Sequence, residues 1–546
     1  MVNYSELKKH EDLLQICGKC GDCGTSGTQI STAKRHVSEP CPIKNVMGFE
    51  AYDARGRILI MKTLVDNNFK IDDSFLNWAY SCTQCGSCRE TCLAIEGGID
   101  TPLLIEALRQ DLVDNEFKIE KHDRILESIR KNQNPYGEPK ATRFKFLNGE
   151  AKRDEAEYVL YLGCTSSYRQ QNIAISTIKL LDSLDVNYRI LKDEPCCGSI
   201  LKRYGYRDAF QHLAEENLKY LKEEKTKKII FPCAGCYRTY KSDYEDFNTT
   251  DIEFLHLTEF LEDYFTTHPV GFKLKTHKKI TYHDPCHLGR HSGVYEAPRV
   301  LLRNIENSTF IELDTLRNYS HCCGAGGGVK SSNSELAVQV ASNRNMEALD
   351  KSIDILISAC PFCERNLKDG IPENANGYQI NDISEILCET YQKDLSSQVL
   401  DQSGSESKIC QNYMEFLGQY PEIFSDLITG SDMDFAIYDS FEDFEDETPM
   451  DIFHVYRTDD GIQIHSGKAD DADLELALSK EAVAKLIQMN SKNDYASLFG
   501  DFYNEPDIDE GWIDFLLHKR TKTLINMGYG KFAEAAGILE DEDEVA

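Results

Sequence analysis

The chain of 546 residues has no apolar run close to the roughly 18 residues that a membrane span needs. Its first residues, MVNYSELKKHEDLLQ, also lack the apolar core of a signal peptide. We therefore expect a cytoplasmic protein that reaches the inner face of a membrane only through a partner. Positive charge is scarce, because 60 Lys and Arg stand against 92 Asp and Glu, a net charge of −32. This balance argues against nonspecific binding to nucleic acid or to anionic lipid.

A nucleotide or flavin fingerprint is also missing. The run GAGGG (324–328) follows a cysteine pair, whereas the GxGxxG motif opens a strand–helix unit. The negative charge is uneven, since residues 401–546 account for about −24 of it. This composition marks the C-terminal part as a separate unit.

Cysteine, in contrast, is abundant, with 20 residues. In a long chain without a signal peptide, such a number indicates metal or redox chemistry instead of a disulfide framework. The segment CTQCGSCRETC (82–92) has the spacing of [4Fe–4S] ferredoxins, in which the fourth cysteine ligates the other cluster. With CGKCGDC (17–23), it predicts two cubane [4Fe–4S] clusters with exchanged fourth ligands. The predicted sets are Cys17, Cys20, Cys23 and Cys92 for one cluster, and Cys82, Cys85, Cys88 and Cys41 for the other. Zinc and disulfides are the alternatives, but zinc normally takes its ligands in two pairs.

Ten further cysteines form two copies of one pattern, in which a single cysteine precedes an adjacent pair and then a CxxC pair. The landmarks recur at offsets of 122, 126 and 127 residues, which indicates a duplicated unit. The two sets are Cys164, Cys196, Cys197, Cys233 and Cys236, and Cys286, Cys322, Cys323, Cys360 and Cys363.

The local pattern around these cysteines predicts an α/β fold. Four short β-rich runs end near cysteines, and segments such as 172–185 and 207–225 have helical apolar spacing. Alternating strands and helices predict parallel sheets with the cysteines gathered at the carboxyl ends of the strands. Gly198 and Gly324 are expected to let the backbone approach a bulky cluster and to direct N–H groups toward its sulfur, with a plain tight turn as the alternative.

Five cysteines per copy are one more than a zinc ion or an ordinary cubane takes. An adjacent pair suits a cluster in which one thiolate bridges two irons while its neighbour holds a third position. The spacing therefore predicts an unusual iron–sulfur site in each copy. A thiol–disulfide redox role for the CxxC pairs is the competing interpretation.

With these motifs, the chain resembles the family of the D-type subunit of heterodisulfide reductase and its cysteine-rich (CCG) domain. The resemblance covers residues 1 to about 395 and includes NPYGEP (134–139) and HDPCHLGR (283–290). It implies that each five-cysteine copy binds a non-cubane [4Fe–4S] cluster, and that these ten cysteines are catalytic. Electrons would enter through the two cubanes, pass to the two non-cubane clusters and reduce a disulfide such as the coenzyme B–coenzyme M heterodisulfide.

Other members of the wider superfamily are electron relays. The iron–sulfur subunits of glycolate, lactate and glycerol-3-phosphate dehydrogenases look similar, as do conduit subunits of larger bifurcating complexes. All these interpretations imply a hetero-oligomer with a flavoprotein or cytochrome b-type donor and no nucleic acid. The resemblance also suggests an anaerobic, archaeal host and methanogenesis. Four histidines flank the second copy and are either proton donors or structural residues: His283, His287, His291 and His321.

The predicted organisation has four folded parts and two linkers. A helical ferredoxin-type domain (1–122) and a linker (123–154) precede the first and second cysteine-rich repeats (155–275 and 276–395), and a second linker (396–408) precedes an acidic α+β domain (409–546).

In the acidic domain, residues 462–488 predict a strand, a turn, a strand and a helix. Together with 494–503 they faintly resemble a sterol-carrier-type fold, and a docking module for a partner subunit is the alternative. The charge run at 441–451 predicts a solvated loop. Cys388 and Cys410 fit no cysteine set and are expected to be ordinary thiols.

Overall fold

The computed structural model describes residues 3–24, 40–66, 70–147, 156–392 apart from 246, 248, 250 and 269, and most of 408–535. In the last range the gaps are 441–443, 445–448, 459–460, 470–471, 490, 505, 508–510, 518–523 and 525–526. The chain divides into two compact units, Met1–Val399 and Leu400–Ala546. Residues 396–407 of the predicted linker 396–408 and most of the charge run at 441–451 lie outside the described residues.

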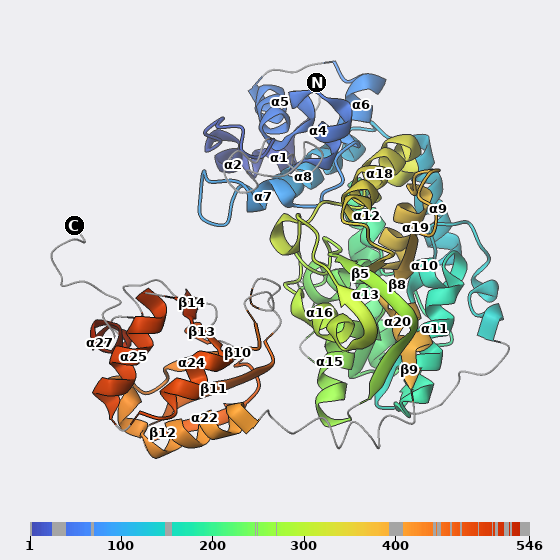
Figure 1. The fold of residues 1–546 in the computed structure, drawn as a ribbon. Helices are drawn as coiled ribbons and strands as arrows, with labels where there is room; N and C mark the ends of the chain where they lie inside the picture. Colours follow the sequence, from blue (N-terminus) through green and yellow to red (C-terminus); the bar gives the residue numbers. More distant parts are fainter. Residues whose placement is uncertain are drawn as a thin grey trace. The chain divides into compact units, whose positions relative to one another are not determined.

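The N-terminal part of the first unit is helical (Figure 1). Its helices are α1 (Ser5–Lys8), α2 (Glu11–Gln15), α4 (Pro42–Met47), α5 (Ala54–Asp66), α6 (Asp73–Ala79), α7 (Ser87–Glu90) and α8 (Thr101–Asp114). Helix α8 begins where the Asp100 carboxylate accepts the N–H of Leu103, a standard N-cap. Asp111 on the same helix accepts the N–H groups of Glu6 and Leu7 at 2.9 and 2.8 Å and so attaches α1. Short helices around a small core (Met61, Leu104, Leu108) thus place the first eight predicted ligands on loops and short helices.

The segment that follows is folded over its described part. Helix α9 (Glu120–Asn132) crosses the predicted boundary at 122/123, and residues 133–147 continue along the first repeat. There Arg143 donates to the carboxylate of Glu194 at 2.8 Å, with both side chains almost fully buried. The described part of the predicted linker 123–154 is therefore folded against the first repeat. Helix α9 and the buried Arg143–Glu194 ion pair fix its position.

The first repeat is a four-stranded parallel sheet in the order β2-β1-β3-β4, covered by helices. Its elements are β1 (Tyr158–Leu160), α10 (Gly163–Tyr168), α11 (Gln171–Ser183), β2 (Tyr188–Arg189), α12 (Ser199–Tyr204), α13 (Arg207–Glu223), β3 (Lys228–Phe231), α14 (Ala234–Arg238), β4 (Glu253–His256) and α15 (Leu257–Thr267). The predicted parallel sheet is confirmed. Helical crossovers join its strands and cover both faces of the sheet, as is usual for parallel sheets.

The second repeat has the same strand order, β6-β5-β7-β8, with a short β9 antiparallel to β5. Its elements are β5 (Gly271–His283), α16 (Glu296–Arg303), β6 (Ile305–Phe310), α17 (Val329–Ser332), α18 (Ser334–Asp350), β7 (Ile355–Ser358), α19 (Pro361–Asp369), β8 (Gln379–Asp382), α20 (Ile383–Thr390) and β9 (Tyr391–Gln392). Strand β5 begins at Gly271, so the boundary predicted at 275/276 falls inside it. The polar stretch KLKTHKK hides the first half of this strand from a hydrophobicity pattern.

The two repeats contact each other reciprocally. Helix α11 packs against α20, and α16 packs against α15. Helix α16 in the second repeat is equivalent to α11 in the first, and α20 is equivalent to α15. Each contact therefore joins the same two types of helix, so the interface has approximate twofold symmetry. Both α15 and α20 begin with a capping box, at His256 with Glu259 and at Asp382 with Glu385. This pairing buries both sheets in one continuous apolar core.

The second unit is a five-stranded mixed sheet in the order β12-β11-β10-β13-β14. Its elements are α22 (Lys408–Gln419), β10 (Asp432–Tyr438), β11 (Asp451–Thr458), β12 (Gly461–Ser466), β13 (Leu474–Ser479), α24 (Lys480–Leu486), α25 (Lys492–Asn504), β14 (Ile513–Leu517) and α27 (Tyr529–Ala535). The strand, strand and helix expected at 462–488 are present, but β12 and β13 do not pair with each other. Among the described residues of the whole chain, no helix is both long and apolar enough to cross a membrane.

Candidate iron–sulfur sites

Two small cavities lie in the N-terminal helical part, each with an empty volume of about 360 Å³. The first is lined by Cys17, Cys20, Cys23 and Cys92, together with Cys88. The second is lined by Cys41, Cys82, Cys85 and Cys88. The structure therefore brings together the two sets of thiols that the exchange of fourth ligands predicts.

These thiols favour a cationic ligand. Burial raises the pKa of Cys23 to about 12, and burial also raises the pKa of Cys41 to about 12. Thiolates enclosed in this way need positive charge to offset the lost hydration, and a metal centre supplies it. All twenty cysteines lie in the described part of the chain and none forms a disulfide. The donor set and the cavity thus fit a thiolate-ligated metal cluster.

A third, much larger cavity lies between the two repeats, with an empty volume of about 1910 Å³. It is lined by nine of the ten repeat cysteines: Cys164, Cys196, Cys197, Cys233, Cys236, Cys286, Cys323, Cys360 and Cys363. The tenth, Cys322, is buried beside Cys286 and Cys323, with whose thiols it makes side-chain contacts. Each repeat thus gathers its five thiols, as the spacing predicts.

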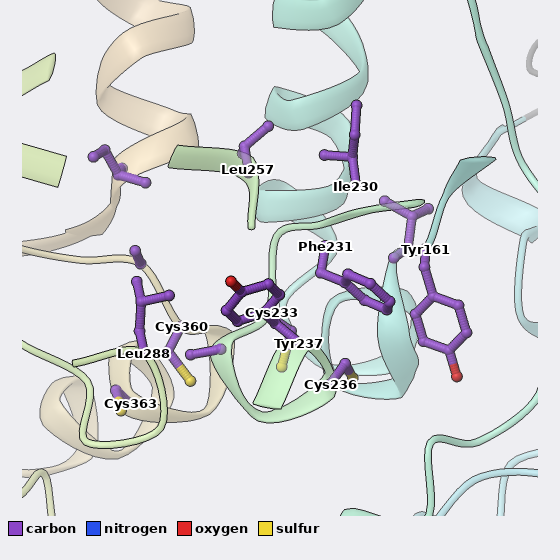
Figure 2. Close-up of a cluster of buried hydrophobic side chains, with 14 of the residues drawn as sticks. Tyr161, Ile230, Phe231, Cys233, Cys236, Tyr237, Leu257, Leu288, Cys360 and Cys363 are labelled. Atoms are coloured by element: carbon purple, nitrogen blue, oxygen red, sulfur yellow. The ribbon is translucent and has the colours of Figure 1, made fainter. Parts of the chain in front are cut away.

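The strand ends position these thiols. Strand β3 ends at Phe231 and Cys233 is the N-cap residue of α14, while β7 ends at Ser358 and Cys360 is the N-cap residue of α19. Figure 2 shows the sulfurs of Cys233, Cys236, Cys360 and Cys363 on one side of the apolar cluster, with Ile230 and Leu257 on the other side. The carboxyl ends of parallel strands therefore present the cysteines to the cavity.

Gly198 and Gly324 follow the adjacent cysteine pairs and adopt positive φ of +77° and +86°. The N–H of Gly198 points at the sulfur of Cys196 at 3.5 Å, and that of Gly324 at the sulfur of Cys322 at 3.4 Å. A side chain at Gly324 would stand 2.5 Å from the carbonyl oxygen of Ala337. The left-handed turn and the close helix both require glycine here, and the turn directs its N–H toward sulfur.

The four cysteine sets form a series. Cys88 lines both small cavities. The thiol of Cys85 contacts that of Cys322 in the second repeat, and the thiol of Cys360 contacts that of Cys233 in the first repeat. We call the four cysteines Cys17, Cys20, Cys23 and Cys92 the Cys17 set, and the four cysteines Cys82, Cys85, Cys88 and Cys41 the Cys82 set. The contacts place the four sets in the order Cys17 set, Cys82 set, second repeat and first repeat.

The loops that join this series are held by buried backbone contacts. Arg290 donates to the carbonyl oxygen of Cys85 at 2.8 Å, and His291 Nε2 donates to that of Gln84 at 3.1 Å. Arg290 and His291 both lie in the loop after Cys286. The second repeat therefore forms direct hydrogen bonds to the loop that carries Cys82 and Cys85.

Buried carboxylates orient the first cysteine of each repeat. In the first repeat, Glu194 accepts the N–H groups of Leu162 and Gly163 at 2.8 and 2.9 Å and so ties the Cys164 loop to the Cys196 loop. In the second, Asp284 forms a bidentate pair with Arg299 at 2.8 and 2.9 Å. Charge-assisted bonds of this kind hold their partners in a defined orientation.

Several residues of the large cavity were not predicted from the sequence. Among the described residues that line it, six are cationic and none is Asp or Glu: Lys121, Arg124, Arg169, Arg203, Lys330 and Arg365. Their positions are scattered along the chain, so no local motif marks them. In the segment NPYGEP, which is part of the family resemblance, Pro135, Tyr136 and Gly137 also line the cavity.

The four histidines separate in the structure. His287 lines the cavity, and His291 bonds to the Cys82 loop. His283 is fully buried and shares a cluster with Cys323 and Cys363, in which one ring nitrogen and the two sulfurs lie within 4.8 Å of one another. His321 is buried next to Cys322.

Fold and cysteines together define an iron–sulfur oxidoreductase component with a duplicated cysteine-rich domain. The model of the CCG cysteine-rich domain family matches residues 158–241 and 280–368. The D-type subunit of dihydromethanophenazine:CoB–CoM heterodisulfide reductase from Methanosarcina barkeri is 37% identical over 325 residues, which are 58% of this chain and 79% of that protein. The chain belongs to the family of this D-type heterodisulfide reductase subunit.

More distant relatives differ in their names. The B-type subunit of fumarate reductase (CoM/CoB) from Methanothermobacter marburgensis is 30% identical over 58% of this chain and 62% of that protein. EtfAB:quinone oxidoreductase of Syntrophomonas wolfei is 30% identical over 56% of this chain and 46% of that protein. The architecture is thus shared by oxidoreductases with different acceptors.

Proposed function

We propose that the chain is the catalytic iron–sulfur subunit of a disulfide reductase. The observation that supports this most directly is the series of four cysteine sets that ends in a large cavity lined by both repeats. Ferredoxin-type cubanes at the Cys17 and Cys82 sets and non-cubane [4Fe–4S] clusters at the two repeats would supply one-electron carriers and, at the repeats, iron that accepts sulfur.

The chain's own residues bind and orient the substrate in this proposal. Cleavage of a disulfide to two thiols takes two electrons and two protons, and the cavity between the repeats presents one cysteine set to each half of the substrate. His287 is the histidine among the described residues that line the cavity, and burial holds its pKa well below the ordinary value. We propose that it relays protons to the substrate as a neutral imidazole. Of the six cationic lining residues, four pair with carboxylates outside the lining: Arg124, Arg169, Arg203 and Lys330. Lys121 and Arg365 have no ion pair among the described residues, and they favour a disulfide that bears anionic groups.

The relatives extend this proposal to partners. One relative's name includes dihydromethanophenazine and the CoB–CoM heterodisulfide, and by analogy we propose a cytochrome b-type or flavoprotein donor and a methanogen-like, anaerobic setting. The similarity to EtfAB:quinone oxidoreductase favours a second candidate, an electron relay from a flavoprotein to quinone. Because all ten repeat cysteines are present and gathered, we place catalysis first.

Turnover of the purified protein under anaerobic conditions tests this proposal. With reduced viologen as donor, we expect cleavage of the coenzyme M–coenzyme B disulfide and about sixteen iron atoms per chain, four for each [4Fe–4S] cluster. Rapid reduction by a flavoprotein without any disulfide cleavage would select the relay. An iron content near eight would remove the assignment of clusters to the repeats.

A further inference from the structure

The two repeats differ at one position beside the cysteines. The residue three places before the first cysteine is Tyr161 in the first repeat and His283 in the second. Each follows or ends the central strand of its sheet, since β1 ends at Leu160 and β5 ends at His283. Both side chains are fully buried. The equivalent cysteine sets therefore have chemically different neighbours.

The protonation of His283 follows from its contact with Arg344. Arg344 Nε donates to His283 Nδ1 at 3.3 Å. Because an arginine nitrogen can only donate, Nδ1 must accept, and the proton of the neutral imidazole lies on Nε2.

Arg344 is itself held firmly in this orientation. It donates to the carbonyl oxygen of Thr315 at 3.0 Å and to the carboxylate of Glu347 at 2.5 Å, and both charged side chains are 1% exposed. The tautomer of His283 is therefore set by a buried, fully engaged guanidinium.

The remaining N–H of His283 has no hydrogen-bond partner among the described residues. The ring lies beside the sulfurs of Cys323 and Cys363, within 4.8 Å. A buried donor without an acceptor costs free energy unless a ligand or a ligated sulfur satisfies it. Two cysteine sulfurs that carry negative charge in a metal site are suitable acceptors.

The first repeat lacks this donor. The hydroxyl of Tyr161 donates to the carbonyl oxygen of Pro195 at 2.5 Å, so its hydrogen is directed at the backbone and away from sulfur. The asymmetry therefore consists of a buried, unpartnered N–H on a ring beside the cysteines of the second repeat, and no such donor from the matching residue of the first.

We propose that His283 is a positioning residue that donates its Nε2–H to the ligand sulfurs of the second repeat and makes this site easier to reduce than that of the first. The inference rests on the proposed function, in which each repeat holds a cluster. A hydrogen bond to a thiolate ligand stabilises the reduced, more negative state and raises the reduction potential. The second repeat is also the one in contact with the Cys82 set, so the first electron resides there.

Redox titration of the intact protein, followed by EPR, tests the proposal. The signal of the second repeat is assigned as the one that Cys322→Ser removes. We expect His283→Phe to lower its midpoint potential so that the reduction equilibrium falls about tenfold, which is about 59 mV for a one-electron couple. His283→Gln, whose amide can accept from Arg344 and donate to sulfur, is expected to recover most of the shift.

Tyr161→Phe is the matched control in the first repeat, because it removes a hydroxyl that donates to the carbonyl oxygen of Pro195 and not to sulfur. It is expected to leave both midpoints unchanged. An unchanged midpoint in both His283 variants, or an equal shift in Tyr161→Phe, would overturn the inference.

Pulsed EPR of the unsubstituted protein provides a measurement that does not depend on the His283 variants folding. A weak nitrogen coupling on the second-repeat signal supports the hydrogen bond, whereas a strong coupling would show direct ligation by His283 and refute it. If Cys322→Ser removes no signal and the iron content is near eight, the proposed function itself fails, and this outcome is distinct from a failure of the His283 inference.

Discussion

Arg109 on α8 illustrates how a single residue can hold together the parts of the fold that carry the cysteine sets. It is fully buried, and its guanidinium donates to four backbone carbonyl oxygens, those of Ala79 and Cys82 beside the Cys82 set, Arg203 of the first repeat and Gly327 of the second. None of these bonds pairs it with a carboxylate. One cation therefore joins three parts of the first unit through backbone groups.

Arg109→Met should be strongly destabilising, because it leaves four buried carbonyl oxygens without a donor. We expect the free energy of unfolding to fall by about 4 kcal/mol, as measured by anaerobic denaturant titration of the cluster-loaded protein. Arg130→Met is the control, since Arg130 is 59% exposed and forms a surface ion pair with Glu127, and a change within about 0.5 kcal/mol is expected there. Equal losses in the two variants would contradict this role of Arg109.

At this scale, the sequence predicts ligands better than supporting residues. The cysteines are identifiable because clusters impose short, regular spacings on the residues that bind them. Arg109 is not identifiable, because a side chain that bonds to backbone carbonyls has partners of any residue type. The same holds for the six cationic residues of the large cavity. They share a location in the folded protein but no sequence motif.

Among the elements, the turn after each adjacent cysteine pair is the most constrained. Gly324 has φ of +86°, and a Cβ there would lie 2.5 Å from the carbonyl oxygen of Ala337 and 2.8 Å from Val340. Gly377 has nearly the same φ, +81°, with no atom within 4 Å of the corresponding position. A substitution at Gly377 therefore measures the cost of the left-handed backbone alone, whereas one at Gly324 measures that cost together with steric overlap.

We expect Gly377→Ala to lower the stability by about 1–2 kcal/mol, the cost of a left-handed residue with a side chain. Gly324→Ala should cost at least about 2 kcal/mol more, because α18 cannot withdraw from the turn without breaking its packing. Thermal unfolding and iron content of both variants measure the difference. Similar unfolding temperatures and full iron content in both would show that the close helix does not constrain the turn.

Element type was predictable where the pattern was strong. The short apolar runs before Cys164, Cys233, Cys286 and Cys360 are strands, and the spacing at 172–185 and 207–225 gives α11 and α13. Boundaries were less predictable. The polar first half of β5 shows no strand pattern, because its pairing with β6 on one side and β9 on the other decides its conformation.

For the molecule as a whole, the division into two units has a direct consequence. All eighteen predicted ligands lie between Cys17 and Cys363, inside the unit Met1–Val399, and the second unit has its own apolar core. A protein of residues 1–399 is therefore expected to keep the iron content and EPR signals of the full chain. Iron analysis per chain and spectra of both proteins check this, and a loss of more than one cluster's iron from the shorter protein would contradict it.

The reciprocal packing of the repeats is also a property of the whole molecule. The sequence indicates a duplication, and a duplicated unit commonly pairs about a twofold axis. Which helices pair is decided by shape complementarity between α11 and α20 and between α15 and α16, which no local pattern encodes.

The sequence alone determined the cysteine sets, the duplication and the α/β character of the repeats, because short-range spacing is dictated by cluster geometry and by strand and helix periodicity. Tertiary structure alone decided the rest: the order of the four sets, the cationic lining of the cavity, the backbone contacts of Arg109 and the different contacts of Tyr161 and His283. These features depend on distances between residues far apart in the chain, and such distances arise only when the sheets and helices pack.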